Sequence, residues 1–273
     1  MRRRGPKGHW ALLLLGGIAF ASGLLLQGYA HGAVGESARH VYAGRGGAPR
    51  AVLRGGPLPT VPSLRTPART IALTFDDGPG PYTPQVLSIL ERHGVPATFF
   101  EVGVLERYFY GSTSAIVADG DAIGDHTEGH AAMSRLSRAG QSRQLLADAA
   151  AIERRGARFP RLFRPPYGMW NRTTLGLLHR YRMLMVLWTV DTGDYRRPGV
   201  KAIVRAALAG ARPGAIILLH DAGGNRAQTV KALPRIIAGL RHRGYRLVTV
   251  PRLLLDNPAP RVQNIAAVIG TGG

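Results

Sequence analysis

The sequence contains no cysteine, and its only lysines are at positions 7, 201 and 231. Disulfides and thiolate metal sites are therefore excluded, so a metal would need histidine, aspartate or glutamate ligands. Acidic residues are also scarce, with 16 Asp and Glu against 36 Lys and Arg. The net charge of +20 favours anionic partners such as membrane headgroups, anionic polymers or nucleic acid, although arginine-rich coding explains it equally well.

The N-terminal region combines a basic start with a long uncharged stretch. Arg2, Arg3, Arg4 and Lys7 precede residues 10–29, which carry no charge and are rich in Leu, Ala, Gly and Phe. This pattern predicts a signal peptide or signal anchor over residues 1–30, and both alternatives stay open. The basic end should remain cytoplasmic, so the rest of the chain is expected to be exported, either membrane-anchored or secreted after cleavage. An exported chain has no access to cytoplasmic nucleic acid, and we expect no nucleic-acid partner.

Residues 31–69 are rich in Gly, Pro, Ala and Arg and predict a flexible basic linker, and residues 257–273 a loose tail. Between them, residues 70–256 alternate short apolar runs with amphipathic segments, as expected for one α/β domain. The predicted strands are 70–73, 97–102, 122–124, 162–163, 183–190, 215–219 and 245–250. The predicted helices are 83–94, capped by Thr83 and closed by Gly94, and 104–118, 137–155, 172–180, 200–208 and 229–243. About seven such strand–helix units favour a closed or nearly closed parallel (β/α) barrel.

Ionisable residues follow the ends of several predicted strands. They are Asp76-Asp77, Asp125-His126, Arg164, Asp191 and His220. The carboxyl ends of the strands of a parallel barrel share one face, so these side chains are expected to meet at one rim. An Asp-Asp-Gly turn on the surface is the simpler alternative for Asp76 and Asp77 taken alone.

His126 and His130 are four residues apart, a spacing that puts two imidazoles on one face of a helical turn. With a carboxylate from another loop they would make a two-histidine, one-carboxylate metal site with open positions. Such a metal activates a water and polarises a carbonyl. Hydrolysis also needs a base and an acid, and the second Asp and His220 can supply them.

Five motifs together resemble those of one family. They are Thr74-Phe75-Asp76-Asp77-Gly78, His126-Thr127-x-x-His130, Arg164-Pro165-Pro166-Tyr167-Gly168, Asp191-x-x-Asp194 and Leu218-Leu219-His220. In order and spacing, from about residue 70 to 250, they resemble the polysaccharide deacetylases, the NodB-like domains of carbohydrate esterase family four. The resemblance implies a distorted (β/α) barrel that removes acetyl groups from sugars with a divalent metal, usually Zn²⁺, with Co²⁺ or other ions possible.

The resemblance also implies roles for individual residues. Asp76 would be the catalytic base, and Asp77, His126 and His130 would hold the metal. Arg164 would fix the base through an ion pair. His220 would protonate the leaving amine, oriented by an acid of the fourth motif, for which Asp194 is favoured over Asp191.

The remaining implied roles concern the substrate. The backbone N–H of Tyr167 would stabilise the oxyanion, and Leu218 would line the pocket for the acetyl methyl group. Tyr195 stands where the family often has Trp, which predicts an altered pocket shape or substrate preference. Tyr108, Phe109 and Tyr110 form either a sugar-stacking patch or a buried helix face.

The sequence therefore predicts a monomeric, metal-dependent N-deacetylase acting on an extracytoplasmic glycan that contains N-acetylglucosamine. Peptidoglycan is the favoured substrate and chitin oligomers are next. Two alternatives remain: an O-acetyl esterase acting on a polysaccharide such as xylan, and a non-catalytic glycan-binding protein on the same fold.

Overall fold

The computed structural model describes residues 52–53 and 68–258. The predictions for the signal or anchor segment, for most of the linker and for all but the first two residues of the tail lie outside the described residues. Two residues of the predicted linker form a short strand, β1 (Val52–Leu53). Among the described residues, no helix has the length and apolar character needed to cross a bilayer.

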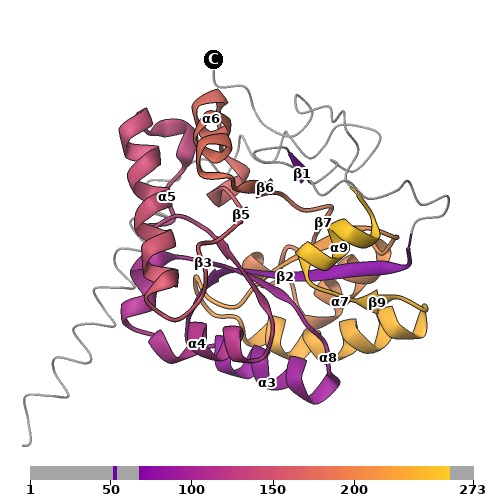
Figure 1. Ribbon diagram of the computed structural model, residues 1–273. Helices are drawn as coiled ribbons and strands as arrows, with labels where there is room; N and C mark the ends of the chain where they lie inside the picture. Colours follow the sequence, from indigo (N-terminus) through magenta and orange to yellow (C-terminus); the bar gives the residue numbers. More distant parts are fainter. Residues whose placement is uncertain (1–51, 54–67, 259–273) are drawn as a thin grey trace, which may run out of the picture. The chain divides into compact units, whose positions relative to one another are not determined.

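The described strands form one curled sheet (Figure 1). Besides β1 they are β2 (Thr70–Gly78), β3 (Thr98–Glu101), β4 (Ala122–Asp125), β5 (Leu162–Phe163), β6 (Leu184–Val186), β7 (Val190–Asp191), β8 (Ala215–His220) and β9 (Arg246–Leu247). Their order is β1-β6-β5-β4-β3-β2-β8-β7, with β9 added to β2. All pairs except β1–β6 are parallel, so the predicted parallel α/β fold of about seven strands is confirmed, as an open half-barrel.

Helices pack against the sheet, mostly from the outside, and the last of them packs on the inner side with Ala72 and Ile216. They are α3 (Thr83–His93), α4 (Tyr110–Ala118), α5 (Arg138–Glu153), α6 (Arg172–Tyr181), α7 (Val200–Ala209), α8 (Ala227–His242) and α9 (Val250–Asp256). Side chains alternate along a strand, so Ile71, Leu73 and Phe75 of β2 pack into the core that includes residues of α3 and α8, while Thr74 and Asp76 face the inside of the sheet. The inside of the half-barrel is therefore where polar groups collect.

The predicted helix 104–118 is interrupted. Residues Gly103–Arg107 form a 3₁₀ turn, and α4 starts only at Tyr110. The reason is a neighbouring loop: the N–H groups of Gly103 and Val104 donate to the carbonyl oxygens of Thr127 and Glu128. These bonds fix the first residues outside a regular helix.

The predicted strand 183–190 is in fact two strands: β7 is at one end of the strand order, and β6 is near the other end, next to the short strand β1. The chain crosses between them at Leu187–Thr189. The carbonyl oxygens of Val186 and Leu187 accept hydrogen bonds from the Arg164 guanidinium, and Thr189 bonds to Ile216 of β8. A continuous apolar run thus holds both edges of the half-barrel, and we call this crossing the seam.

Two smaller predictions also need correction. The strand 245–250 shrinks to β9, because the Thr249 hydroxyl accepts a hydrogen bond from Arg252 N–H and starts α9. The cap of α3 is Tyr82, without a side-chain bond, and not Thr83. The Thr83 hydroxyl instead accepts the Gly80 N–H at 2.8 Å and donates to Asp221.

Candidate active site and metal centre

Asp76 and Asp77 both reach the rim at the end of β2 and are nearly fully buried. In a regular strand their side chains would point to opposite faces. Asp77 has a left-handed backbone, φ 71°, and the register with β3 shifts between Asp76 and Gly78. As a result Nε2 of His126 lies 3.8 Å from Oδ2 of Asp76 and 3.6 Å from Oδ1 of Asp77. A Cβ on Gly223 would lie 2.1 Å from Oδ2 of Asp77, so this glycine leaves room for the second carboxylate.

The two histidines lie on an irregular loop after β4, and the expected helical turn is absent there. Thr127 and His130 have positive φ values of 71° and 54°, which turn the chain back on itself. The rings still meet, with centroids 5.1 Å apart. The spacing of four residues therefore brings both imidazoles to one place by a different backbone path.

The chemistry of Asp77, His126 and His130 fits a divalent metal. One ligand atom from each lies within 4.8 Å of the others. The Nδ1 of His126 lies 2.7 Å from the carbonyl oxygen of Arg164, so its proton is placed there and Nε2 keeps its lone pair for a metal. Burial alone would raise the pKa of Asp77, yet the charges and hydrogen bonds of His130 and His126 hold this pKa well below its usual range. These three residues could hold a metal ion.

Arg164 is fully buried inside the half-barrel. Its Nη1 donates to Oδ1 of Asp76 at 2.6 Å and to the Thr74 hydroxyl at 2.9 Å. Its Nε and Nη2 donate to the two carbonyl oxygens of the seam, each at 3.0 Å, and the guanidinium lies 4.1 Å from the Phe100 ring centroid. Burial lowers the pKa of Arg164, and Asp76 opposes that shift. A buried cation with this many partners fixes the position of Asp76.

His220, at the end of β8, is held by Asp194 from the loop after β7. One carboxylate oxygen of Asp194 lies 2.7 Å from the Nδ1 of His220, and the other accepts the backbone N–H of His220 at 2.8 Å and the hydroxyl of Thr229 at 2.7 Å. Burial lowers the pKa of His220, but the Asp194 carboxylate outweighs burial and raises this pKa to about 9. The metal-free pair is therefore an imidazolium bound to a carboxylate.

The structure separates the two acids of the fourth motif. Asp191 accepts the Gly193 N–H at 2.8 Å and lies 3.3 Å from the Tyr195 hydroxyl, which positions it to shape its own loop. The Tyr195 ring packs edge-on against His220 at 5.4 Å. Leu218 is buried on the same face of β8 as His220, two residues earlier.

Tyr167 lies beside the metal ligands. Its hydroxyl is 3.1 Å from Nδ1 of His130, and the two rings meet edge-on at 4.7 Å. Burial and the nearby charge of Asp77 raise the pKa of Tyr167, so the phenol stays protonated. Its backbone has φ 60°.

Sequence reasoning missed Asp148, which comes from the middle of α5 and is fully buried. Its Oδ2 accepts the backbone N–H of His126 at 2.9 Å, and Asp125 beside it accepts the Thr127 N–H at 2.8 Å. Burial raises the pKa of Asp148 well above its usual range, and the charge of Asp125 adds to this. The signal was present: an acid between Leu145 and Ala149, on the apolar face of a predicted helix, needs a buried partner.

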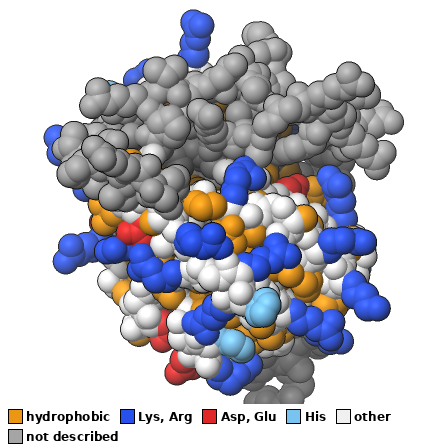
Figure 2. Space-filling view, turned by 90° about the vertical axis from the view of Figure 1, so that its right-hand side faces the viewer, with side chains coloured by type: hydrophobic (Ala, Val, Ile, Leu, Met, Phe, Trp, Pro, Cys, Tyr) orange, Lys and Arg blue, Asp and Glu red, His pale blue; other side chains and the backbone are white. Residues whose placement is uncertain are grey.

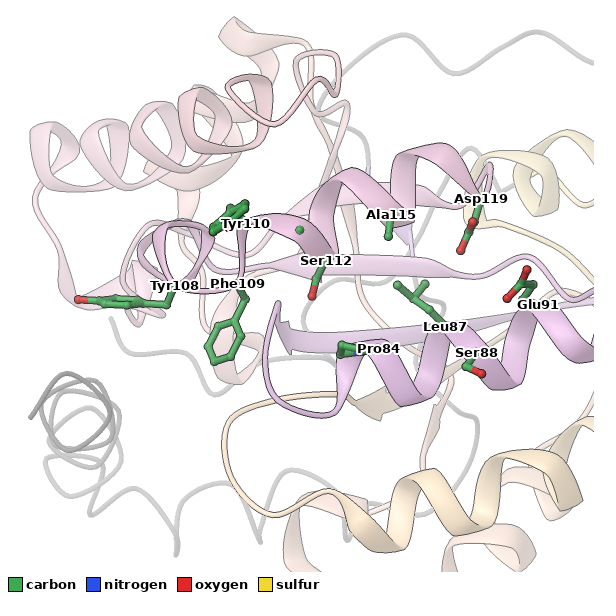
Figure 3. Close-up of a pocket in the computed structure, with 11 residues that line it drawn as sticks. Pro84, Leu87, Ser88, Glu91, Tyr108, Phe109, Tyr110, Ser112, Ala115 and Asp119 are labelled. Atoms are coloured by element: carbon green, nitrogen blue, oxygen red, sulfur yellow. The ribbon is translucent and has the colours of Figure 1, made fainter. Parts of the chain in front are cut away.

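A groove of about 480 Å³ lies between α3 and α4, away from these side chains (Figure 3). Its lining includes Tyr108, Phe109 and Tyr110, together with the carboxylates Glu91 and Asp119. Tyr108 and Tyr110 are exposed, so the alternative of a buried helix face is wrong for both. Arg107, the residue before Tyr108 in the sequence, pairs with Glu128 of the histidine loop at 3.5 Å and so links the segment at one end of the groove to that loop.

Comparisons with known proteins agree with this geometry. Residues 63–186 match the family model for polysaccharide deacetylases. Over 207 residues, 71% of this chain, the sequence is 40% identical to a chitooligosaccharide deacetylase of Sinorhizobium fredii, and the match covers 96% of that relative. Over 190 residues, 68% of this chain, it is 39% identical to a peptidoglycan-N-acetylglucosamine deacetylase of Bacillus cereus, 88% of which is covered.

A solved structure is similar as well. A family 4 carbohydrate esterase from Streptomyces lividans, in complex with acetate, superposes with a TM-score of 0.64 at 32% sequence identity. The superposition covers 68% of this chain and 96% of that structure. The similarity therefore extends over nearly the whole of a protein of this kind.

Proposed function

Because the chain belongs to the polysaccharide deacetylase family, we propose that it removes acetyl groups from N-acetylglucosamine residues of an extracytoplasmic glycan. Relatives named for chitooligosaccharide and for peptidoglycan are both about 40% identical to this chain, so both substrates are candidates. We favour peptidoglycan and place chitin oligomers next. Export and membrane anchoring belong to this proposal and are supported by the basic start and the uncharged residues 10–29.

The observation that carries the proposal is the division of labour between two adjacent carboxylates. Asp77 faces His126 and His130, whereas Asp76 is bound to the Arg164 guanidinium. Two neighbouring carboxylates repel each other when both are ionised, so each disfavours the charged form of the other. Here each carboxylate has its own partners, so the two can take different roles.

A divalent ion held by Asp77, His126 and His130, with Zn²⁺ as our expectation and Co²⁺ as a substitute, would polarise the acetyl carbonyl and lower the pKa of a bound water. As the oxygen of the attacking water bonds to the acetyl carbon, Asp76 takes a proton from that water. Arg164 keeps the Asp76 carboxylate in place for that transfer. The Tyr167 N–H donates to the negative oxygen that develops on the acetyl group.

His220 completes the reaction at the other side of the acetyl carbon. As the C–N bond breaks, the imidazolium of His220 gives its Nε2 proton to the sugar amine, since its Nδ1 is bound to Asp194. Asp194 holds the ring and favours its charged form. The products are acetate and a glucosamine unit, and Leu218 on the same face of β8 would contact the acetyl methyl group.

The groove between α3 and α4 suits a substrate longer than one sugar. Exposed aromatic rings stack on sugar faces, and carboxylates accept hydrogen bonds from hydroxyls and attract the amines of deacetylated units. Tyr108 and Glu91 offer both features within one groove (Figure 3). A neighbouring part of the polymer could therefore bind there while one residue occupies the rim.

The test is acetate release by the 66–273 fragment, with zinc or cobalt, from N-acetylglucosamine oligomers, peptidoglycan and acetylxylan. We expect release from the N-acetylated glycans, lost in Asp76→Asn and retained in Glu153→Gln, which changes an exposed carboxylate of α5 outside the groove. Release from acetylxylan alone would replace the proposal by an esterase. No release from any substrate, despite bound metal, would favour the non-catalytic alternative.

A further inference from the structure

The end of the half-barrel opposite the active site carries a dense group of exposed arginines. They lie where β2 and β9 begin, before β8, on α9, and at the ends of α3 and α8: Arg69, Arg92, Arg212, Arg241, Arg243, Arg246 and Arg252. We call this group the basic pole. Figure 2 looks at this side of the molecule and shows Lys and Arg side chains spread over its described surface among uncharged and hydrophobic ones, with few acids.

Hydrogen bonds bring several of these segments together. Arg69 donates to the carbonyl oxygens of Arg243 and Gly244, and Arg241 reaches the carbonyl of Gly94 at the end of α3, next to Arg92. The N–H of Arg246 donates to the carbonyl oxygen of Arg69, where β9 pairs with β2. Segments far apart in the sequence thus bring their charges to one place.

Positive charge at helix C-termini has an ordinary structural explanation, because it complements the helix dipole. That explanation covers Arg92 and Arg241 but not Arg69 and Arg212, which precede strands, or Arg246, which begins β9. Opposite charge is limited: Asp256 pairs with Arg246 at 2.7 Å and with Arg252 at 2.9 Å. Three further acids, Glu91, Asp119 and Asp121, lie on the adjoining α3–α4 side.

The position of the pole relative to the chain gives it meaning. β2 begins at Thr70, beside Arg69, and ends at the catalytic carboxylates, so the two ends of one strand, about 20 Å apart, join the pole to the rim. The basic pole and the catalytic rim therefore lie at opposite ends of the same strand.

We propose that the basic pole docks on anionic lipid headgroups and holds the catalytic rim away from the bilayer, toward the glycan. The proposal depends on the export and anchoring given under the proposed function. Linked to a membrane span, the domain would stay close to the membrane surface. Tethering raises the local concentration, so weak binding by the pole is enough to orient the domain.

The test uses the 66–273 fragment, which lacks the uncharged segment. The Sinorhizobium relative, almost all of whose length is matched, indicates that such a domain stands alone. Flotation is measured with vesicles of pure phosphatidylcholine and with vesicles containing 30% phosphatidylglycerol, on the order of physiological salt, where screening acts within about 8 Å. The pole variant replaces Arg92, Arg212, Arg241 and Arg252 by Gln. Its control replaces four exposed arginines of α5 and α6 by Gln, Arg138, Arg143, Arg172 and Arg180, with the same loss of charge.

We expect binding to anionic vesicles only, weakened at least tenfold in the pole variant and less than threefold in the control, since each surface arginine contributes about fivefold. Equal losses in both variants would overturn the proposal in favour of net charge. Free poly(glycerol phosphate) that competes fully with the vesicles would also overturn it, by making the partner a soluble polyanion. Activity on soluble chitooligosaccharide should be the same in all three proteins, so a failure of docking is distinguishable from a failure of the proposed catalysis.

Discussion

At the rim, Asp76, Asp77 and Arg164 are at most 3% exposed, whereas Arg246 and Arg252 at the basic pole leave 59% and 55% of their side chains in solvent. Burial makes each rim charge dependent on a particular partner, because an unpaired buried charge is very costly. The pole arginines are exposed to solvent, and Arg246 and Arg252 share a single carboxylate, that of Asp256. At the rim, therefore, binding depends on the exact position of individual charged atoms. At the basic pole it depends on the number of exposed charges.

The largest expected effect is the loss of the base at the rim. Asp76→Asn keeps the shape and one acceptor for Arg164 but cannot take a proton, so acetate release should fall about 10²- to 10⁴-fold. Metal content, measured on the same preparation, should stay near the wild-type value. A fall of less than tenfold would remove Asp76 from the role of base.

Arg164→Met tests the dependence of buried charges on their partners. It leaves Asp76 unpaired and two seam carbonyls without their donor, and should lower the free energy of unfolding by about 3–5 kcal/mol. Arg172→Met, at the exposed start of α6, should change it by less than about 0.5 kcal/mol. Urea unfolding gives both values, and similar values for the two variants would contradict the contrast between buried and exposed charge.

The His220–Asp194 pair predicts a pH dependence. Because the pKa of His220 is raised to about 9 from 6.5, the stability that the pair contributes is complete below pH 6.5 and is lost as the pH rises through 9. In Asp194→Asn the pKa should fall, since burial then opposes the charge with less compensation. NMR titration of the imidazole in the metal-free protein measures this, and an unchanged pKa would exclude Asp194 as its cause.

Asp121 is an intermediate case near the pole, partly buried and accepting the Ala97 N–H at 2.6 Å. Burial raises its pKa to about 6 from 3.8, so folding is penalised when the carboxylate ionises. The penalty is absent below pH 3.8 and complete above pH 6. Asp121→Asn should stabilise the protein by on the order of 1 kcal/mol at pH 8, after a discount for solvent screening, and very little at pH 4. Thermal unfolding at the two pH values shows whether the difference exists.

The smallest expected effect is in the groove. Tyr108→Ala removes an exposed ring and should raise KM for long glycans about two- to fivefold, leaving kcat and the KM for a disaccharide unchanged. Leu146→Ala, an exposed apolar residue on α5, serves as the control. An equal change for short and long substrates would show that Tyr108 acts on the rim instead.

The sequence predicted the fold and the meeting of the motifs because strand ends of a parallel sheet share one edge. Asp76, Asp77, His126, Arg164 and His220 follow such ends, and the structure brings them together; their roles remain predictions. The backbone at Asp77 and His130 was beyond prediction, since positive φ values in residues other than glycine depend on tertiary contacts.

Other misses have similar causes. Residues 183–190 form one apolar run, and no residue within it marks the crossing between β6 and β7. The hydrogen bonds that hold the crossing come from Arg164, which lies about 20 residues earlier in the sequence. Asp148 was visible as an acid on an apolar helix face, but its partner, the His126 N–H, is brought to it only by folding. Long-range hydrogen bonds decided both cases.

The seam also constrains how the protein can be re-engineered. A circular permutant with new ends in an exposed loop would keep both edges of the sheet joined by the main chain. New ends between Val186 and Val190 would remove that link and loosen the two carbonyl oxygens that hold the Arg164 guanidinium, whose other bonds fix Asp76. The crossing that joins β6 to β7 also holds Arg164, which aligns the proposed base. The path of the chain at the seam is therefore part of the catalytic geometry.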